Sequence, residues 1–166
     1  RKKGSCPKVS SMTFAIREYL SEEADLACDV RGLVSSESRD RFKKQLETVG
    51  QWTDHYLHLA LDKDGQLIGD IQLRHCDRTM PDGVAHIGID ISDKERGKGA
   101  GTSALQLAWQ WAQANGFHRL EGSTEVSNLA MRRAFEKADW HFEGTLKNLF
   151  IDAGVGRDYL SFTKTI

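Results

Sequence analysis

The fold of this chain is decided by residues 87–112, which read IGIDIS, then DKERGKGAGT, then SALQLAWQWA. The first six residues alternate β-branched side chains with small or polar ones, a pattern typical of a strand. The last ten place Leu105, Ala108, Trp109 and Ala112 at helical spacing. The sequence therefore predicts a strand that leads into a helix through a glycine-rich turn.

The turn itself carries Gly97, Gly99 and Gly101 two residues apart. Arg96 precedes the first glycine, and Lys98 lies between the first two. Such a turn leaves backbone N–H groups exposed at the start of a helix and lets a ligand approach where a Cβ would block it. The two cations beside it favour a pyrophosphate site over a plain turn. The spacing is neither that of a P-loop, since Gly99 stands where Ser or Thr is needed, nor the dinucleotide G-x-G-x-x-G.

Composition is that of one globular domain with a sizeable core: 166 residues, 39% apolar and 28% charged. The net charge of −1 provides no general field for nucleic acid or for a membrane surface, and no apolar run approaches the length of a membrane span. We therefore expect neither nucleic acid nor a membrane as a partner. Residues 1–12 are polar and basic and are expected to be a disordered leader or tag remnant, with a single domain over 13–166.

The three cysteines, Cys6, Cys28 and Cys76, lie far apart in the sequence. They fit no metal-ligand spacing, so we expect no metal site. Free thiols in a reducing cytoplasm are the simplest interpretation of an odd, scattered set.

Periodicity and turn signals predict an alternation of strands and helices along the rest of the chain. Strong turn signals are Asp62-Lys63-Asp64-Gly65 between two strands and Asn115-Gly116 after a helix. The predicted strands are 14–19, 56–61, 67–73, 85–92, 118–126, 141–150 and 157–165, and the predicted helices are 22–33, 37–49, 102–115 and 128–138.

Two downstream segments accompany the glycine turn: SNLAMRRAFEKADWHFEG over 127–144 and GRDYLSF over 156–162. With RGKGAG at 96–101, they resemble the motifs of the GNAT N-acetyltransferase superfamily. That family's acyl-CoA loop reads Arg or Gln, two residues, Gly, one residue, then Gly or Ala. The second segment resembles its N-x-x-A-x-x-x-Y-E-K-x-G-F motif. The continuation into EG and the last strand are similar to the RimJ/RimL-like (ribosomal-protein acetyltransferase) branch.

The resemblance implies an α/β (α+β) fold, the GNAT acyl-CoA N-acyltransferase fold, with a mixed, mostly antiparallel seven-stranded sheet and helices on both faces. It implies direct transfer of an acetyl group from acetyl-CoA to a primary amine, either a protein N-terminus or a small amine such as an antibiotic. The alternative is an acyl-CoA-binding module without transferase activity. Several members of this branch form homodimers, which the sequence leaves open here.

The resemblance also assigns cofactor-binding residues. Asn128 would bind the pantetheine arm, or act only as a helix N-cap, while cations on the helix after it would meet the nucleotide phosphates or form a solvated face. The pyrophosphate cradle maps to Arg96, Gly97, Lys98, Gly99, Ala100, Gly101 and Thr102, the strand edge for the arm to Ile89, Asp90 and Ile91, and the helix cations to Arg133 and Lys137.

An alkyl amine is protonated at neutral pH, so a base must remove a proton before attack. Glu121 aligns with the glutamate used as base in some members of the branch, although a solvent-facing strand residue is the alternative. His86 and Asp90 are rivals, because other family members place the base on the preceding strand. The acceptor is expected between the two N-terminal helices, the loop before strand 85–92 and the C-terminal hairpin.

The acid that protonates the leaving thiolate departs from the family's pattern. Phe135 stands where the family often has a tyrosine, and Met131 stands where some members have a serine. Neither can donate a proton. We therefore expect Ser127 or a water to substitute, or the thiolate to leave unaided.

Overall fold

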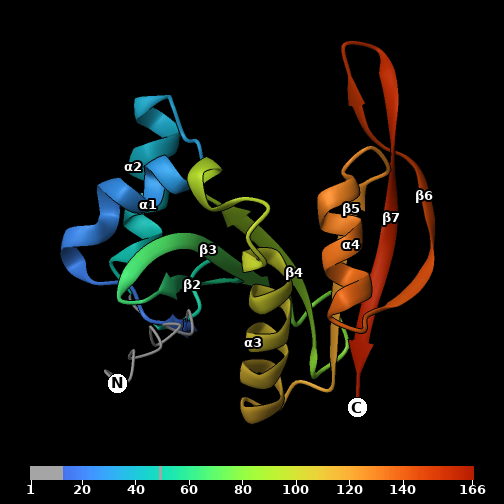
Figure 1. Ribbon diagram of the computed structural model, residues 1–166, viewed down its shortest axis with the longest axis horizontal. Helices are drawn as coiled ribbons and strands as arrows, with labels where there is room; N and C mark the ends of the chain where they lie inside the picture. The colour runs from blue at the N-terminus through green and yellow to red at the C-terminus, as the bar shows by residue number, and fades with distance from the viewer. Residues whose placement is uncertain (1–12, 49) are drawn as a thin grey trace, which may run out of the picture.

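The computed structural model describes residues 13–48 and 50–166, which form one seven-stranded sheet with helices on both faces (Figure 1). Strand order is β1-β2-β3-β4-β5-β7-β6, and only the β4–β5 pair is parallel. The mixed, mostly antiparallel sheet predicted from the sequence is confirmed. The predicted leader, residues 1–12, lies outside the described residues. The strands are β1 Phe14–Arg17, β2 Tyr56–Lys63, β3 Gln66–Arg74, β4 Val84–Ile91, β5 Arg119–Glu125, β6 His141–Asp152 and β7 Val155–Thr165, and the helices are α1 Ala24–Val30, α2 Ser36–Leu46, α3 Ala100–Ala114 and α4 Leu129–Lys137.

The β2–β3 hairpin turns more tightly than its sequence indicated. Lys63 still pairs with Gln66, so only Asp64 and Gly65 form the loop, at φ 52° and 87°. Two consecutive positive φ values suit the right-handed twist of a hairpin, and Asp-Gly is a favoured pair for them. The predicted turn over 62–65 was therefore too wide by two residues, because Asp62 and Lys63 both belong to β2.

Helices α3 and α4 pack on one face of the sheet, and α1 and α2 pack on the other (Figure 1). Four alanines of α3 are buried against leucines and isoleucines of β2 and β3, which brings that helix close to the sheet. On the opposite face, Phe42 and Leu46 of α2 and Ala27 of α1 pack with Ala60 of β2. Among the described residues, no helix is long and apolar enough to span a membrane.

The N-terminal elements are shorter than predicted. Strand β1 ends at Arg17 rather than at 19, because Tyr19 turns inward and donates a hydrogen bond of 2.7 Å to the buried Asp70. The helix predicted over 22–33 is a 3₁₀ turn, Ser21–Glu23, followed by α1, and Gly32 at φ 66° ends it. The next helix ends at Leu46, and residue 49 of its predicted range is outside the described part.

The two parallel strands separate after a short pairing. Val84, Ala85 and His86 of β4 pair with Arg119, Leu120 and Glu121 of β5, and no further pair follows although both strands continue. Beyond His86, β4 keeps its pairing with β3 only, from Leu73–Ile87 to Gly69–Ile91. The sheet therefore has an opening in its middle, beside the N-terminus of α3.

Phe135, which stands where the family motif often has a tyrosine, is a core residue. Its side chain is 2% exposed and stacks on Phe162 with ring centroids 4.5 Å apart. Trp140 meets it edge-on at 5.3 Å. The position therefore contributes packing between α4 and the sheet.

Truncating this aromatic contact should destabilise the fold. Phe135→Ala is expected to lower the free energy of unfolding by about 3–5 kcal/mol, because it removes a buried ring and leaves a cavity. Leu129→Ala, on the same helix but half exposed, should cost less than about 0.5 kcal/mol. Urea denaturation of both variants without ligand measures the difference, and equal costs would contradict the packing role.

Candidate active site

The glycine loop enters α3 through two residues in the left-handed region. Gly97 has φ 74°, and Gly99, the residue before the first turn of α3, has φ 86°. Within the described residues, a Cβ built on either glycine would meet no atom within 4 Å. The loop is therefore open to solvent, and the N–H groups that the first helical turn leaves unpaired are accessible to an anion.

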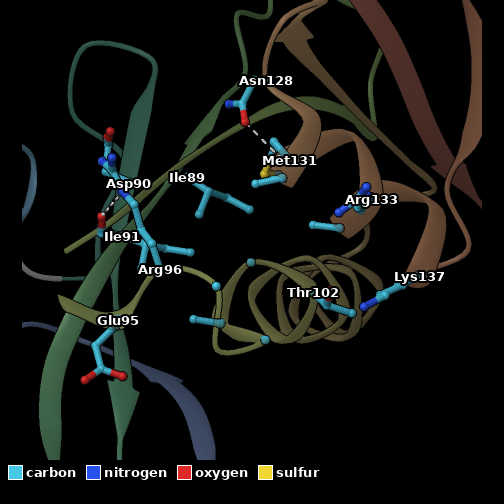
Figure 2. A pocket seen from close by; sticks show the side chains of 16 residues that line it. Ile89, Asp90, Ile91, Glu95, Arg96, Thr102, Asn128, Met131, Arg133 and Lys137 are labelled. Atoms are coloured by element: carbon cyan, nitrogen blue, oxygen red, sulfur yellow. Dashed lines mark hydrogen bonds between the residues drawn. The ribbon is translucent and has the colours of Figure 1, made fainter. Parts of the chain in front are cut away.

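A groove of about 510 Å³ lies between the end of β4, the glycine loop and the facing sides of α3 and α4 (Figure 2). It brings together every predicted cofactor-binding residue except Lys98, whose ammonium lies 3.6 Å from the Glu95 carboxylate. Lys98 is not among the residues that line the groove, and a contribution of its backbone N–H to the cradle stays a prediction. The predicted residues that line it are Ile89, Asp90, Ile91, Arg96, Gly97, Gly99, Ala100, Gly101, Thr102, Asn128, Arg133 and Lys137.

The groove carries unneutralised positive charge on its α4 side. Arg133 and Lys137 line it, and in the described part of the chain neither has an ion-pair partner. Arg96 is held in place, since its Nε donates to the carbonyl of Ile91 at 3.2 Å and a terminal nitrogen lies 3.0 Å from Asp93. These three cations and the helix N-terminus favour an anionic ligand.

Asn128 is the N-cap of α4 and also faces the groove. Its Oδ1 accepts a hydrogen bond of 3.1 Å from the backbone N–H of Met131, so it is the N-cap of α4. It also lines the groove, as Figure 2 shows. The cap uses the oxygen and leaves the amide N–H₂ as a donor for a ligand.

Sequence reasoning missed four residues of the groove wall: Glu95, Ala130, Met131 and Ala134. The two alanines and Met131 follow Asn128 on α4, with Ala130 exposed and Ala134 buried, and their place in the segment after Asn128 was the available signal. Glu95 contacts Lys63 at 2.6 Å, and this ammonium lowers the pKa of the Glu95 carboxyl. An acidic residue at the loop gave no signal, because its partner lies on a distant strand.

The predicted acid–base residues fall into two places. Asp90 lines the groove, whereas His86 and Glu121 lie together at the last pair of β4 and β5, with Nε2 of His86 2.9 Å from Oε2 of Glu121. Ser127 is exposed in the turn before α4 and does not line the groove. Of the residues proposed for proton transfer, it is the one the structure sets apart.

Asp90 belongs to a charged cluster that joins β3, β4 and α1. Nε of Arg31 lies 3.4 Å from Asp90 and 3.7 Å from Asp70, which is fully buried. Asp70 also accepts a hydrogen bond from the hydroxyl of Tyr19 and lies 3.1 Å from Nδ1 of His58. Burial raises the pKa of Asp90, the charge of Arg31 opposes this rise, and Asp70 adds to it.

The sequence matches the family model for the acetyltransferase (GNAT) domain over residues 16–141. This chain belongs to the GNAT acetyltransferase family. It is 30% identical over 123 residues to a Bacillus subtilis (strain 168) protein named probable N-acetyltransferase YjcK, a match that covers 73% of this chain and 67% of that protein. The family transfers acetyl groups to amines, and this chain is accordingly an N-acetyltransferase.

Solved GNAT structures share the fold at low identity. Mycobacterium smegmatis RimJ in complex with CoA-disulfide superimposes with a TM-score of 0.71 at 18% identity, covering 92% of this chain and 81% of that one. A spermidine N-acetyltransferase chimera of Vibrio cholerae SpeG and hSSAT gives 0.74 at 15%, covering 92% and 95%. The ribosomal-protein-alanine N-acetyltransferase of Brucella melitensis gives 0.70 at 19%, covering 92% and 99%.

Removing the guanidinium of Arg31 should raise the pKa of Asp90 further, because Arg31 is the charge that opposes desolvation. The matched control is Arg41→Met, a residue exposed on α2. NMR titration of the Asp90 carboxyl in Arg31→Met measures the shift, and an unchanged pKa would contradict the ion pair.

Arg31→Met should also change how the free energy of unfolding depends on pH. A carboxyl whose folded pKa exceeds its ordinary value binds more protons when folded, so its contribution to the free energy of unfolding falls as pH rises between the two values. Arg31→Met should widen that pH window. Denaturation at a series of acidic pH values measures this, with Arg41→Met as the reference.

Proposed function

We propose that this chain transfers the acetyl group of acetyl-CoA directly to a primary amine, on a small molecule such as an antibiotic or at a protein N-terminus. The observation that carries the proposal is a single groove lined by the N-terminus of α3, the open edge of β4 and the cations of α4. An elongated anionic thioester needs these three features: a helix N-terminus for its pyrophosphate, an open strand edge for its pantetheine arm, and cations for its remaining phosphates.

The residues present fit such a donor. Gly97, Gly99 and the first turn of α3 would hold the pyrophosphate, since their backbone N–H groups are accessible and the helix dipole favours negative charge. Ile89 and Ile91 have no partner strand on the β5 side, so their stretch of β4 would take the pantetheine arm. Arg133 and Lys137 would meet the remaining phosphates.

Direct transfer is supported by what lines the groove. Thr102 is the one hydroxyl among the described lining residues, which include no cysteine, serine or histidine, so no strong nucleophile is available for an acyl-enzyme. The amine must therefore lose its proton and attack the acetyl carbonyl itself. Because a thiol has a pKa near ~8.5, the thiolate is a fair leaving group without the tyrosine that Phe135 replaces.

The acceptor is proposed to bind on the face of the sheet opposite α3 and α4, beside α1 and the end of β4. Asp90 and Arg31 stand there, together with the His86–Glu121 pair. The RimJ/RimL-like branch is supported by the EG and GRDYLSF segments of this sequence. Both peptide N-termini and small amines such as polyamines remain acceptors to test.

Gly101→Glu should abolish acetyl-CoA binding, lowering affinity more than 100-fold. The backbone of Gly101 is ordinary helix, and a Cβ there would stand 3.4 Å from Ala134 and 3.7 Å from Ile91, so a longer acidic chain enters the groove and repels phosphates. Gly101→Ala is the matched control, since its methyl group meets only ordinary contacts. Calorimetry and thermal melting with acetyl-CoA measure both variants.

Normal binding by Gly101→Glu would overturn the assignment of the loop. A thiol-release assay across small amines and N-terminal peptides then identifies the acceptor class. Tight acetyl-CoA binding with no turnover on any amine would instead favour a binding module without transferase activity.

A further inference from the structure

Four titratable side chains form a continuous row on the open face of β4, β5 and β6. Nε2 of His86 lies 2.9 Å from Oε2 of Glu121, and Oε1 of Glu121 accepts a hydrogen bond of 2.7 Å from Nε of Arg119. The two terminal nitrogens of Arg119 donate to both oxygens of Glu143, at 3.0 and 2.6 Å. Thr163 donates to Glu143 at 3.0 Å and completes the row.

The row begins where the sheet opens. His86 and Glu121 are the last pair between β4 and β5, and the strands separate directly after them. Side chains alternate along a strand, so His86, Gly88 and Asp90 share one face of β4. That face is the one on which Asp70 pairs with Asp90 and Ala60 packs under α1 and α2. A group that passes through the opening from the groove therefore emerges next to His86.

We propose that His86 is the general base for the acceptor amine, and that Glu121, Arg119 and Glu143 are positioning residues that hold it. The inference rests on the proposed function and names the proton acceptor of that same site.

Glu121 is poorly placed to be the base itself. One of its oxygens is engaged by Arg119 and the other by His86, so neither is free for an incoming amine. The carboxylate at Nε2 favours the imidazole tautomer that carries its proton there, which leaves the lone pair on Nδ1. Within residues 13–48 and 50–166, Nδ1 of His86 has no hydrogen-bond partner.

The surroundings of His86 favour its neutral form. Burial lowers the pKa of His86, Glu121 opposes this, and the positive charges of Arg74 on β3 and Arg119 on β5 lower it further. A histidine whose pKa lies below its ordinary value is uncharged at pH 7 and can accept a proton.

In the proposed step, the ammonium of the acceptor gives one proton to Nδ1 of His86, and the freed lone pair forms the C–N bond to the acetyl carbon. The C–S bond breaks and its electron pair leaves with sulfur as the thiolate. The second proton of the nitrogen ends on the thiolate or in solvent, and His86 returns its proton to solvent.

The test compares His86→Gln with Glu121→Gln, using His118→Gln, an exposed histidine, as the matched control. His86→Gln should lower kcat by about 10²- to 10⁴-fold and remove the acidic limb of the pH profile. Glu121→Gln should keep measurable activity, with the limb moved to lower pH, because the charge that favours protonated His86 is lost. The affinity for acetyl-CoA should stay within about two-fold of wild type in all three variants, since none of the three residues lines the groove.

A near-normal rate in His86→Gln together with loss of activity in Glu121→Gln would overturn the proposal and make Glu121 the base. NMR titration of His86 without any acceptor gives an independent arm. Its pKa should fall in Glu121→Gln and rise in Arg119→Gln, and an unchanged pKa in both would refute the positioning row. Failure of the wild-type chain to bind acetyl-CoA would contradict the proposed function while leaving this titration result standing.

Discussion

The early end of the β4–β5 pairing is the constraint on which the rest of the site depends. Three residue pairs hold the two strands together, and both strands then run on apart. A fully paired sheet would satisfy these backbone groups internally and close the path between its faces. Because the strands diverge, β4 presents an open edge beside the N-terminus of α3, in the groove that we propose as the donor site.

Charge is distributed differently on the two sides of this opening. On the α3–α4 side, Arg133 and Lys137 lack ion-pair partners among the described residues, which suits a polyanionic donor. On the other side, each of two arginines lies between two carboxylates: Arg31 between Asp70 and Asp90, and Arg119 between Glu121 and Glu143. These two sets carry no excess positive charge and do not attract a polyanion.

The sequence predicted what local spacing controls. The glycine loop, the hairpin at Asp64–Gly65 and the N-cap at Asn128 each follow from a few adjacent residues with defined backbone needs. Contacts between distant segments were out of reach. Lys98 lies in the motif, yet its ammonium lies 3.6 Å from the carboxylate of Glu95, a contact that the motif does not indicate.

The partners of the buried polar groups also could not be predicted from local spacing. Asp70 interrupts an apolar strand, and its partners Tyr19, His58 and Arg31 lie 12 to 51 residues away, after β1, in β2 and at the C-cap of α1. No periodicity in the sequence indicates such a set, because the packing of α1 on β3 brings its members together. The row from His86 to Glu143 is equally long-range: alignment identified Glu121 as a candidate, but only the structure shows both of its oxygens engaged.

The Arg31 cluster also gives α1 a function beyond covering the sheet. A fully buried carboxylate is costly unless it is hydrogen-bonded and paired, so Asp70 requires Tyr19 and Arg31 to stay in place. Both partners come from the N-terminal segment, one just before α1 and one at its end. The same guanidinium contacts Asp90 at the rim of the opening. A shift of α1 would therefore change the charge beside Asp90, which links the packing of α1 to the strand edge that lines the groove.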